Sequence, residues 1–383
     1  MTINKKEIFR IIITSLSLVF AVIYYYIFQQ PLESLSFESP YNYISSFVIP
    51  DTYLYLSVID DHDPISSIFN SVVKNTIGPS LIWYVANGSW LIVIIINAIF
   101  LYWSCYYIFR LCELYNVNSE LPILLIAMNP VTIFYMIGAL KEIPTMLFIL
   151  GFFYYIIKEK TIKWLVFSLL LIIFRYQLLI PLVIFIIMYF TNKNGMYKKS
   201  LYLIVLLCLA FPLINSLNVL SNSATEIFRE EQLSNIGSTL GASIEHIRSN
   251  IYILSAIAIG IRILQSILEP LFYPFQYPLF MVDGVIGIYP LFSFLSFVLT
   301  SYFIFKFIYL LPINLRAKQA TKNKQAIFAL AFLFLIPVAG FSFIHHRYIY
   351  PIIPIIIIAV TVHKKQTQLN KYKISPLNVY RES

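Results

Sequence analysis

Apolar runs of about 20 residues recur along this chain, and they restrict its fold more than any other feature. A helix needs about 20 residues to cross roughly 30 Å of hydrocarbon, and it satisfies its own backbone hydrogen bonds, as lipid requires. A membrane barrel would show short alternating strands, and these runs do not alternate. The chain is 59% hydrophobic and 12% charged, whereas a soluble domain carries about 25% charged residues. We therefore predict an all-α, polytopic bundle of transmembrane helices.

We place ten spans in a single transmembrane domain of residues 1–363, followed by a cytoplasmic tail of residues 364–383. The segment 251–280 is apolar but interrupted by prolines, so it is an eleventh span, a re-entrant pair or an interfacial helix. Two longer loops, 29–88 and 219–285, are expected outside, and loops of this length usually carry function or are disordered. The ten expected spans are 9–28, 89–109, 121–140, 143–157, 162–174, 177–191, 200–218, 286–310, 326–344 and 348–362.

Lysine and arginine gather on one side of this map and set its orientation. Short cytoplasmic loops collect these residues, and the mapped side holds 20 of the 27 basic residues but only five of the 18 acidic residues. We therefore expect an even number of spans and both termini in the cytoplasm. The net charge of +9 fits loops that face anionic lipid. No pattern typical of a nucleic-acid module is present, so we expect no nucleic-acid partner.

Several common catalytic motifs are absent from the sequence. It contains no Walker A motif, no Gly-x-Gly-x-x-Gly after a strand, no His-Glu-x-x-His and no Gly-x-Ser-x-Gly. Its cysteines, Cys105, Cys112 and Cys208, have no metal-type spacing. These observations argue against a nucleotide-driven reaction and a zinc protease, and we expect neither a cofactor nor a metal ion.

Charged residues at the external helix ends are the first candidates for chemistry, because a charge inside a membrane is costly and is usually functional. Lys141 and Glu142 occupy a very short turn, and Pro144 fits the first turn of the next helix. We expect this turn at the external membrane surface, as an ordinary ion-paired turn or an anchor for an anionic headgroup or a sugar. Arg175 occupies another short external turn, where its guanidinium either snorkels to the interface or binds phosphate.

A third external turn, close to the C-terminus, carries His346, Arg347, Tyr348 and Tyr350. The two adjacent histidines that begin this turn form a poor metal pair, because neighbours on a helix point about 100° apart. The alternatives are an aromatic turn at the membrane interface and a site that binds substrate.

The two long loops supply the remaining candidates. In the first loop, Asp51 lies beside Tyr53 and Tyr55, an arrangement suited to a general base or a sugar-binding carboxylate. The cluster at 60–63, Asp-Asp-His-Asp, is a solvated turn or a site for a hard cation. In the second loop, Arg262 interrupts an apolar segment.

In layout the chain resembles the GT-C-type membrane glycosyltransferases, and especially the O-antigen repeat-unit polymerases called Wzy. Four short motifs carry this resemblance, and they are Pro50-Asp51-Thr52-Tyr53-Leu54-Tyr55, Asn129-Pro130 with Ala139-Leu140-Lys141-Glu142, Phe174-Arg175, and His346-Arg347-Tyr348-Ile349-Tyr350-Pro351. The resemblance implies an enzyme of the bacterial inner (plasma) membrane that acts on undecaprenyl-diphosphate-linked glycans at the external face. It also implies a chain-length regulator and a flippase as partners.

The resemblance also implies roles for single residues. A general base, Asp51 or Glu142, would take the proton of the acceptor hydroxyl that attacks the anomeric carbon. Fixed cations would stabilise the diphosphate leaving group: Lys141, Arg175, Arg262 and Arg347. Sugar contacts would come from Tyr53, Tyr55, His346, Tyr348 and Tyr350.

Three other functions stay open. One is a GT-C transferase that adds a single sugar from a polyprenyl-phosphate donor, and another is an O-antigen ligase. The third is a flippase or transporter for a lipid-linked glycan, in which charges would line the mid-membrane parts of several helices. The expected charges at helix ends on one side favour a transferase.

Overall fold

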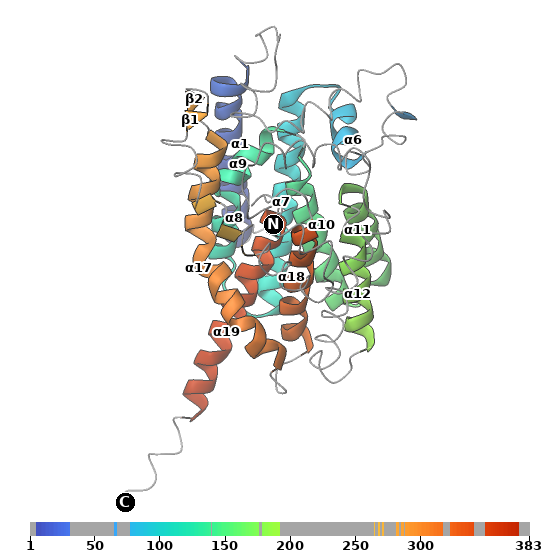
Figure 1. The fold of residues 1–383 in the computed structure, drawn as a ribbon, viewed down its shortest axis with the longest axis vertical. Coiled ribbons are helices and arrows are strands. Elements are labelled where there is room, and N and C mark those ends of the chain that lie inside the picture. Colours follow the sequence, from blue (N-terminus) through green and yellow to red (C-terminus); the bar gives the residue numbers. More distant parts are fainter. Residues whose placement is uncertain are drawn as a thin grey trace, which may run out of the picture.

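The computed structural model describes a bundle of helices that run along one long axis (Figure 1). It describes residues 5–30, 65–66, 77–138, 140–175, 178–191, 288–316, 322–340 and 349–374, with short pieces between 264 and 286. Its elements are α1 (Lys5–Tyr24), a π-helical turn (Tyr25–Gln29), α6 (Ile77–Val85), α7 (Trp90–Leu114), α8 (Glu120–Ala127), α9 (Pro130–Ile137), α10 (Glu142–Ile157), α11 (Thr161–Phe174), α12 (Leu179–Thr191), β1 (Met281–Val282), β2 (Val285–Ile286), α17 (Ile288–Arg316), α18 (Lys322–Gly340), a 3-10 turn (Tyr350–Ile352) and α19 (Ile353–Ile374).

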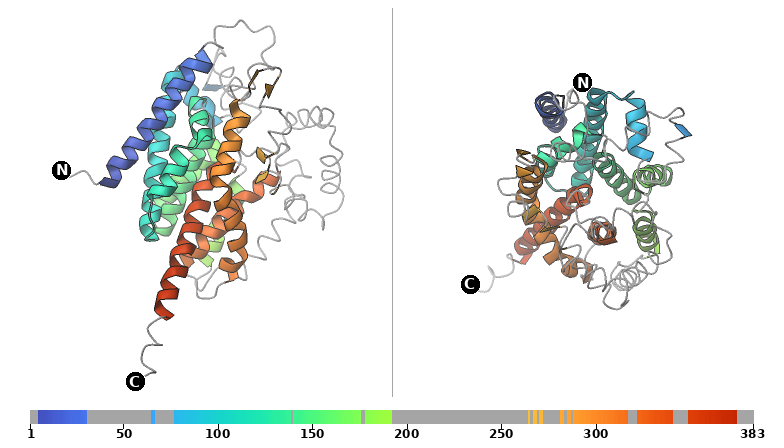
Figure 2. Two further views of the ribbon diagram at one scale, coloured as in Figure 1. Left: turned by 90° about the vertical axis from the view of Figure 1, so that its left-hand side faces the viewer. Right: turned by 45° about the horizontal axis from the view of Figure 1, so that its top comes forward.

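Within the described residues, the predicted all-α class is confirmed. The only strands there are β1 and β2, a two-residue antiparallel pair in which Met281 faces Ile286. The helices pack side by side in one bundle (Figure 2). The core between them is aliphatic and aromatic.

Three described helices are long and apolar enough to cross a membrane: Lys5–Ile27, Trp90–Leu114 and Leu291–Asn314. They also expose large apolar side chains, such as Ile99 and Val298, as a helix in lipid does. The chain therefore has the character of a membrane protein. Of the other expected spans, 121–140 is a bent pair, and 143–157, 162–174, 177–191 and 326–344 fall on shorter apolar helices. The expected span 348–362 falls on the 3-10 turn and α19, and the span 200–218 lies outside the described residues.

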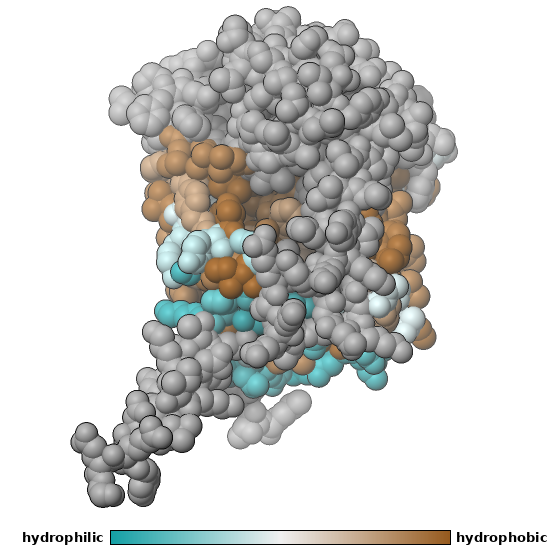
Figure 3. Space-filling view, turned by 60° about the horizontal axis from the view of Figure 1, so that its bottom comes forward, coloured by the Kyte–Doolittle hydropathy of each residue, from teal (hydrophilic) through white to brown (hydrophobic). Residues whose placement is uncertain are grey.

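One end of the bundle collects the start of α1, the end of α7, the start of α18 and the later part of α19. Lys6, Glu113 and Lys365 line one pocket there, and Tyr115 donates to the carbonyl of Asn323 at 2.7 Å. Hydrophilic residues edge this end below an apolar band (Figure 3). We call it the basic end. The start of the first described helix and the later part of the last one thus lie at the same end of the bundle.

The expected span 121–140 is broken, which corrects the prediction of one continuous helix. The halves α8 and α9 meet at an angle of 52°. The break follows from the Asn129-Pro130 pair: the Asn129 side chain accepts from the backbone N–H of Val131 at 3.1 Å, and proline suits the first helical position. The break leaves backbone carbonyls without helical partners, and side chains donate to them instead. Ser17 donates to the carbonyl of Ala127 at 2.7 Å, and Thr132 donates to the carbonyl of Ile126 at 2.5 Å.

Two glycines allow close helix contacts. A Cβ at Gly151 of α10 would lie 2.2 Å from the Phe167 ring of α11, so only glycine lets these helices approach so closely. A Cβ at Gly78 of α6 would similarly lie 2.6 Å from the ring of Phe174. Helix α6 falls inside the expected external loop 29–88, so the last part of that loop is a helix packed against the bundle.

Candidate functional site

The site begins at the short connection between α9 and α10, opposite the basic end. Asn97, buried about two turns after the start of α7, donates from Nδ2 to the carbonyls of Met136 and Gly138 at 2.9 and 2.8 Å. These bonds fix the chain just before Lys141 and Glu142. Helix α10 then starts at Glu142 with Pro144 in its first turn, where a backbone N–H would have no helical partner.

Glu142 forms an ion pair with Arg175, the residue that follows α11. Arg175 Nη2 lies 2.9 Å from Glu142 Oε1, and the two side chains are only 4% and 1% exposed. Lys141 is also buried, at 8% exposure. These charges are therefore enclosed by protein, because the bundle closes over the start of α10 and the end of α11 and the opposite charges of Glu142 and Arg175 compensate each other. Their position at the external membrane surface stays a prediction.

A neutral hydrogen-bonded pair holds the turn before α19 in place. The hydroxyl of Tyr350 bonds to the hydroxyl of Thr132, and since Thr132 gives its proton to the carbonyl of Ile126, Tyr350 is the donor. The Tyr350 ring packs edge-to-face on Tyr135, with centroids 5.1 Å apart. Tyr350 is fully buried, so the expectation that it stacks on a sugar is not met in this structure.

Together these contacts join one charged pair and one broken helix into a single polar region inside the bundle. Helix α10 packs against the turn that carries Tyr350, and the same turn reaches the break between α8 and α9 through Thr132. A fixed guanidinium in such surroundings stabilises negative charge more strongly than it would in water. The start of α10 and the end of α11 thus hold one compensated ion pair, with Lys141 next to it in the chain.

Seven predicted site residues lie outside the described residues, and they are Asp51, Tyr53, Tyr55, Arg262, His346, Arg347 and Tyr348. Among the described candidates, Glu142 and Arg175 form an ion pair, and Lys141 precedes Glu142 in the chain. Asn97 and Thr132, which position this region, were not predicted. In the sequence, Asn97 is a polar residue within a long apolar span. Such a residue usually has a function or forms hydrogen bonds to a neighbouring helix.

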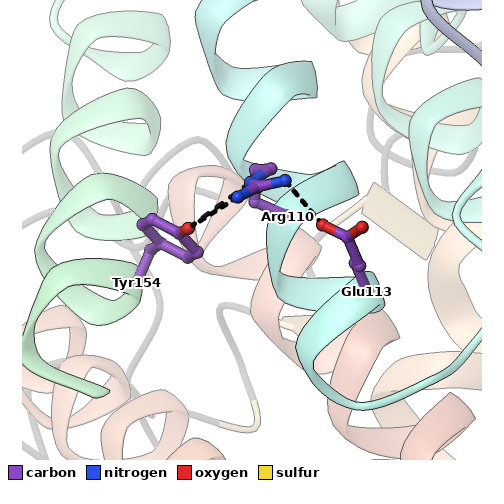
Figure 4. A network of polar contacts seen from close by, with 3 residues as sticks. All are labelled: Arg110, Glu113 and Tyr154. Carbon is purple, nitrogen blue, oxygen red and sulfur yellow. Dashed lines mark hydrogen bonds and ion pairs between the residues drawn. The ribbon is translucent and has the colours of Figure 1, made fainter. Parts of the chain in front are cut away.

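A second polar network lies at the basic end (Figure 4). Arg110 of α7 forms an ion pair with Glu113 at 2.7 Å and donates to the hydroxyl of Tyr154 on α10 at 3.3 Å. Its side chain is 35% exposed and that of Glu113 is 56% exposed, so water reaches both. Within the part of the chain that the structure describes, no group of three or more histidine, cysteine, aspartate or glutamate residues is placed to hold a metal ion.

No family model, no curated protein and no solved structure matches this chain.

Proposed function

We propose that this chain is a membrane glycosyltransferase with a GT-C-like plan that polymerises repeat units carried on undecaprenyl diphosphate, like the Wzy-type enzymes it resembles. One observation carries the proposal. Two cationic residues, Lys141 and Arg175, lie at the end of the bundle opposite the basic end, and Glu142 fixes the second of them. The anionic group of a lipid-linked diphosphate would enter the bundle to reach these two cations.

In the proposed reaction, a hydroxyl of the acceptor glycan forms a bond to the anomeric carbon of the donor glycan. The bond from that carbon to the diphosphate breaks, and undecaprenyl diphosphate leaves with the electron pair. Arg175 and Lys141 stabilise the leaving group, since fixed cations aimed at developing charge are often the largest catalytic contribution.

The burial of Glu142 separates its role from that of Asp51. The carboxylate of Glu142 already accepts a hydrogen bond from the guanidinium of Arg175 at 2.9 Å, so it serves to hold that guanidinium in place. We therefore assign Glu142 to the positioning of Arg175, and we assign the proton transfer to Asp51 in the first loop.

The first test changes the cations without removing the buried charge. Arg175→Lys keeps a positive charge for Glu142 but loses the planar fork that binds phosphate through two bonds. We expect this variant and Lys141→Ala to shorten or abolish the surface glycan ladder on a gel at unchanged protein level. Arg110→Ala, at the basic end, is the control and should leave the ladder intact. A normal ladder from both site variants would refute the proposal.

The product separates the proposed polymerase from a transferase that adds a single sugar. Loss of a polymerase leaves glycans capped with one complete repeat unit and no ladder. Loss of a single-sugar transferase leaves a glycan one residue shorter, with chain length otherwise unchanged. Mass spectrometry of the glycan from a deletion strain therefore distinguishes the two.

A transporter of a lipid-linked glycan is the second candidate, favoured by the break between α8 and α9. Interrupted helices often form the substrate site of transporters near the middle of the membrane. The location of lipid-linked repeat units decides between the candidates. In a deletion strain, units that accumulate on the cytoplasmic side indicate a lost transporter, whereas units that reach the external side indicate a lost polymerase.

A further inference from the structure

An open pocket of about 460 Å³ lies at the basic end, far along the helices from Glu142 and Arg175. Its walls come from the start of α1, the end of α7, the turn into α8, and α19. The volume falls within the roughly 300–1,000 Å³ of typical ligand pockets. Unlike most such pockets, its lining is mainly polar, which suits a charged headgroup better than an apolar ligand.

Two lysines from the two ends of the chain line this pocket. Lys6 of α1 lies over the ring of Phe109 at 5.6 Å. Lys365 of α19 donates to the backbone carbonyl of Asn116 in the turn between α7 and α8. An ammonium group has three donors, so this one bond leaves Lys365 further donors for a ligand. The pocket therefore has a cationic part that suits a phosphate.

Two carboxylates line the same pocket. Glu113 is held by Arg110 at 2.7 Å, and its side chain is more than half exposed. Glu120 accepts from Asn118 at 3.4 Å. An ionised carboxylate offers about four acceptor positions, so both residues can accept further hydrogen bonds. The pocket thus also has an anionic part, which repels a ligand that carries negative charge alone.

We propose that this pocket binds the headgroup of phosphatidylethanolamine. Its phosphate lies between Lys6 and Lys365, and its primary ammonium donates to Glu113 and Glu120. A choline headgroup lacks N–H donors for the carboxylates, and a glycerol headgroup lacks the positive charge. The pocket lies at the basic end, where its lining comes from the ends of apolar helices. Lipid headgroups lie at the ends of membrane-spanning helices, so the lipid rather than a soluble phosphate ester is the ligand.

Native mass spectrometry of the full-length protein in detergent tests this proposal. The protein is mixed with phosphatidylethanolamine, phosphatidylcholine or phosphatidylglycerol of the same acyl chains. We expect about tenfold more retention of phosphatidylethanolamine than of phosphatidylcholine, because charge-assisted hydrogen bonds that choline cannot form are worth at least that factor. Equal retention of the three lipids would overturn the proposal.

Variants locate the binding. Lys6→Gln and Lys365→Gln should each reduce the retention of phosphatidylethanolamine, whereas Lys163→Gln, at the same end but outside the pocket, should not. Equal losses in all three variants would contradict the assigned pocket. Soluble phosphoethanolamine at the same concentration should displace little lipid. Full displacement would show that the pocket serves a soluble ester and would overturn the lipid assignment.

Discussion

The two ends of the bundle carry arginine–glutamate pairs of nearly equal length in opposite environments. Arg175 and Glu142 join two helices at 2.9 Å, and both side chains are almost completely buried. Arg110 and Glu113 lie on one helix at 2.7 Å, and water reaches both. The distance between the charged atoms therefore does not indicate how much stability is lost when one partner of an ion pair is removed. Burial decides this loss, because removing one partner of a buried pair leaves an uncompensated charge inside the protein. Water screens the charge that remains when one partner of an exposed pair is removed.

The largest expected effect follows from removing one charge of the buried pair. Glu142→Ala leaves the Arg175 guanidinium without its carboxylate inside the bundle, which costs about 3–5 kcal/mol of stability. Thermal unfolding of the purified protein in detergent should show a strongly lowered midpoint or a loss of folded protein. A midpoint equal to that of the original chain would mean that burial does not distinguish the two pairs.

A smaller effect is expected from the neutral bond beside the buried pair. Tyr350→Phe removes the donor to Thr132 but keeps the ring that packs on Tyr135. The net loss of one such hydrogen bond is about 0.5–1.5 kcal/mol. The same thermal assay should place this variant between the original chain and Glu142→Ala. A loss of stability as large as that of Glu142→Ala would contradict the expectation that the charged pair contributes more than the neutral hydrogen bond.

The exposed pair should contribute less still. Arg110→Ala, Glu113→Ala and the double variant complete a thermodynamic cycle, and exposed pairs typically yield about 0.2–1 kcal/mol of coupling. Added salt should reduce this coupling, because ions screen charges that water reaches. A coupling of several kcal/mol that persists at high salt would contradict the claim that the exposed pair contributes less than the buried pair.

The smallest effect concerns pH at the basic end. Burial first, and then the charges of Lys324 and Lys306, lower the pKa of His363, which lies 3.1 Å from the Oδ1 atom of Asn314. Its unfolded pKa is about 6.5, so below that value the unfolded chain binds the proton more readily and stability falls. His363→Gln should flatten the decline of the unfolding midpoint between neutral and acidic pH. An unchanged decline would exclude His363 as its source.

Hydropathy was sufficient to predict the helical class and the positions of most described helices. It missed the break in 121–140, because an average over a window hides the capping signal of Asn129 and Pro130. Hydropathy and charge also gave no indication that Glu142 and Arg175 are buried in the protein. That pair joins residues 33 positions apart, and its burial depends on how α10 and α11 pack, which local sequence does not specify.

The prediction of chemistry was limited for a related reason. Lys141, Glu142 and Arg175 were found as charges at helix ends, since such charges are rare next to lipid. Asn97 and Thr132 were not, because their importance depends on carbonyls that only the folded helix break exposes. Side chains that position a site are thus harder to predict than the charges they position.

The most direct test of the central claim replaces the whole buried pair with neutral residues. Replacing both partners of a buried pair with apolar residues of similar volume often leaves stability nearly unchanged, so Glu142→Met combined with Arg175→Met should give folded protein at a normal level. We predict that a strain whose only copy carries both changes makes no long-chain surface glycan. A normal glycan ladder from that strain would contradict the assignment of this pair to the functional site.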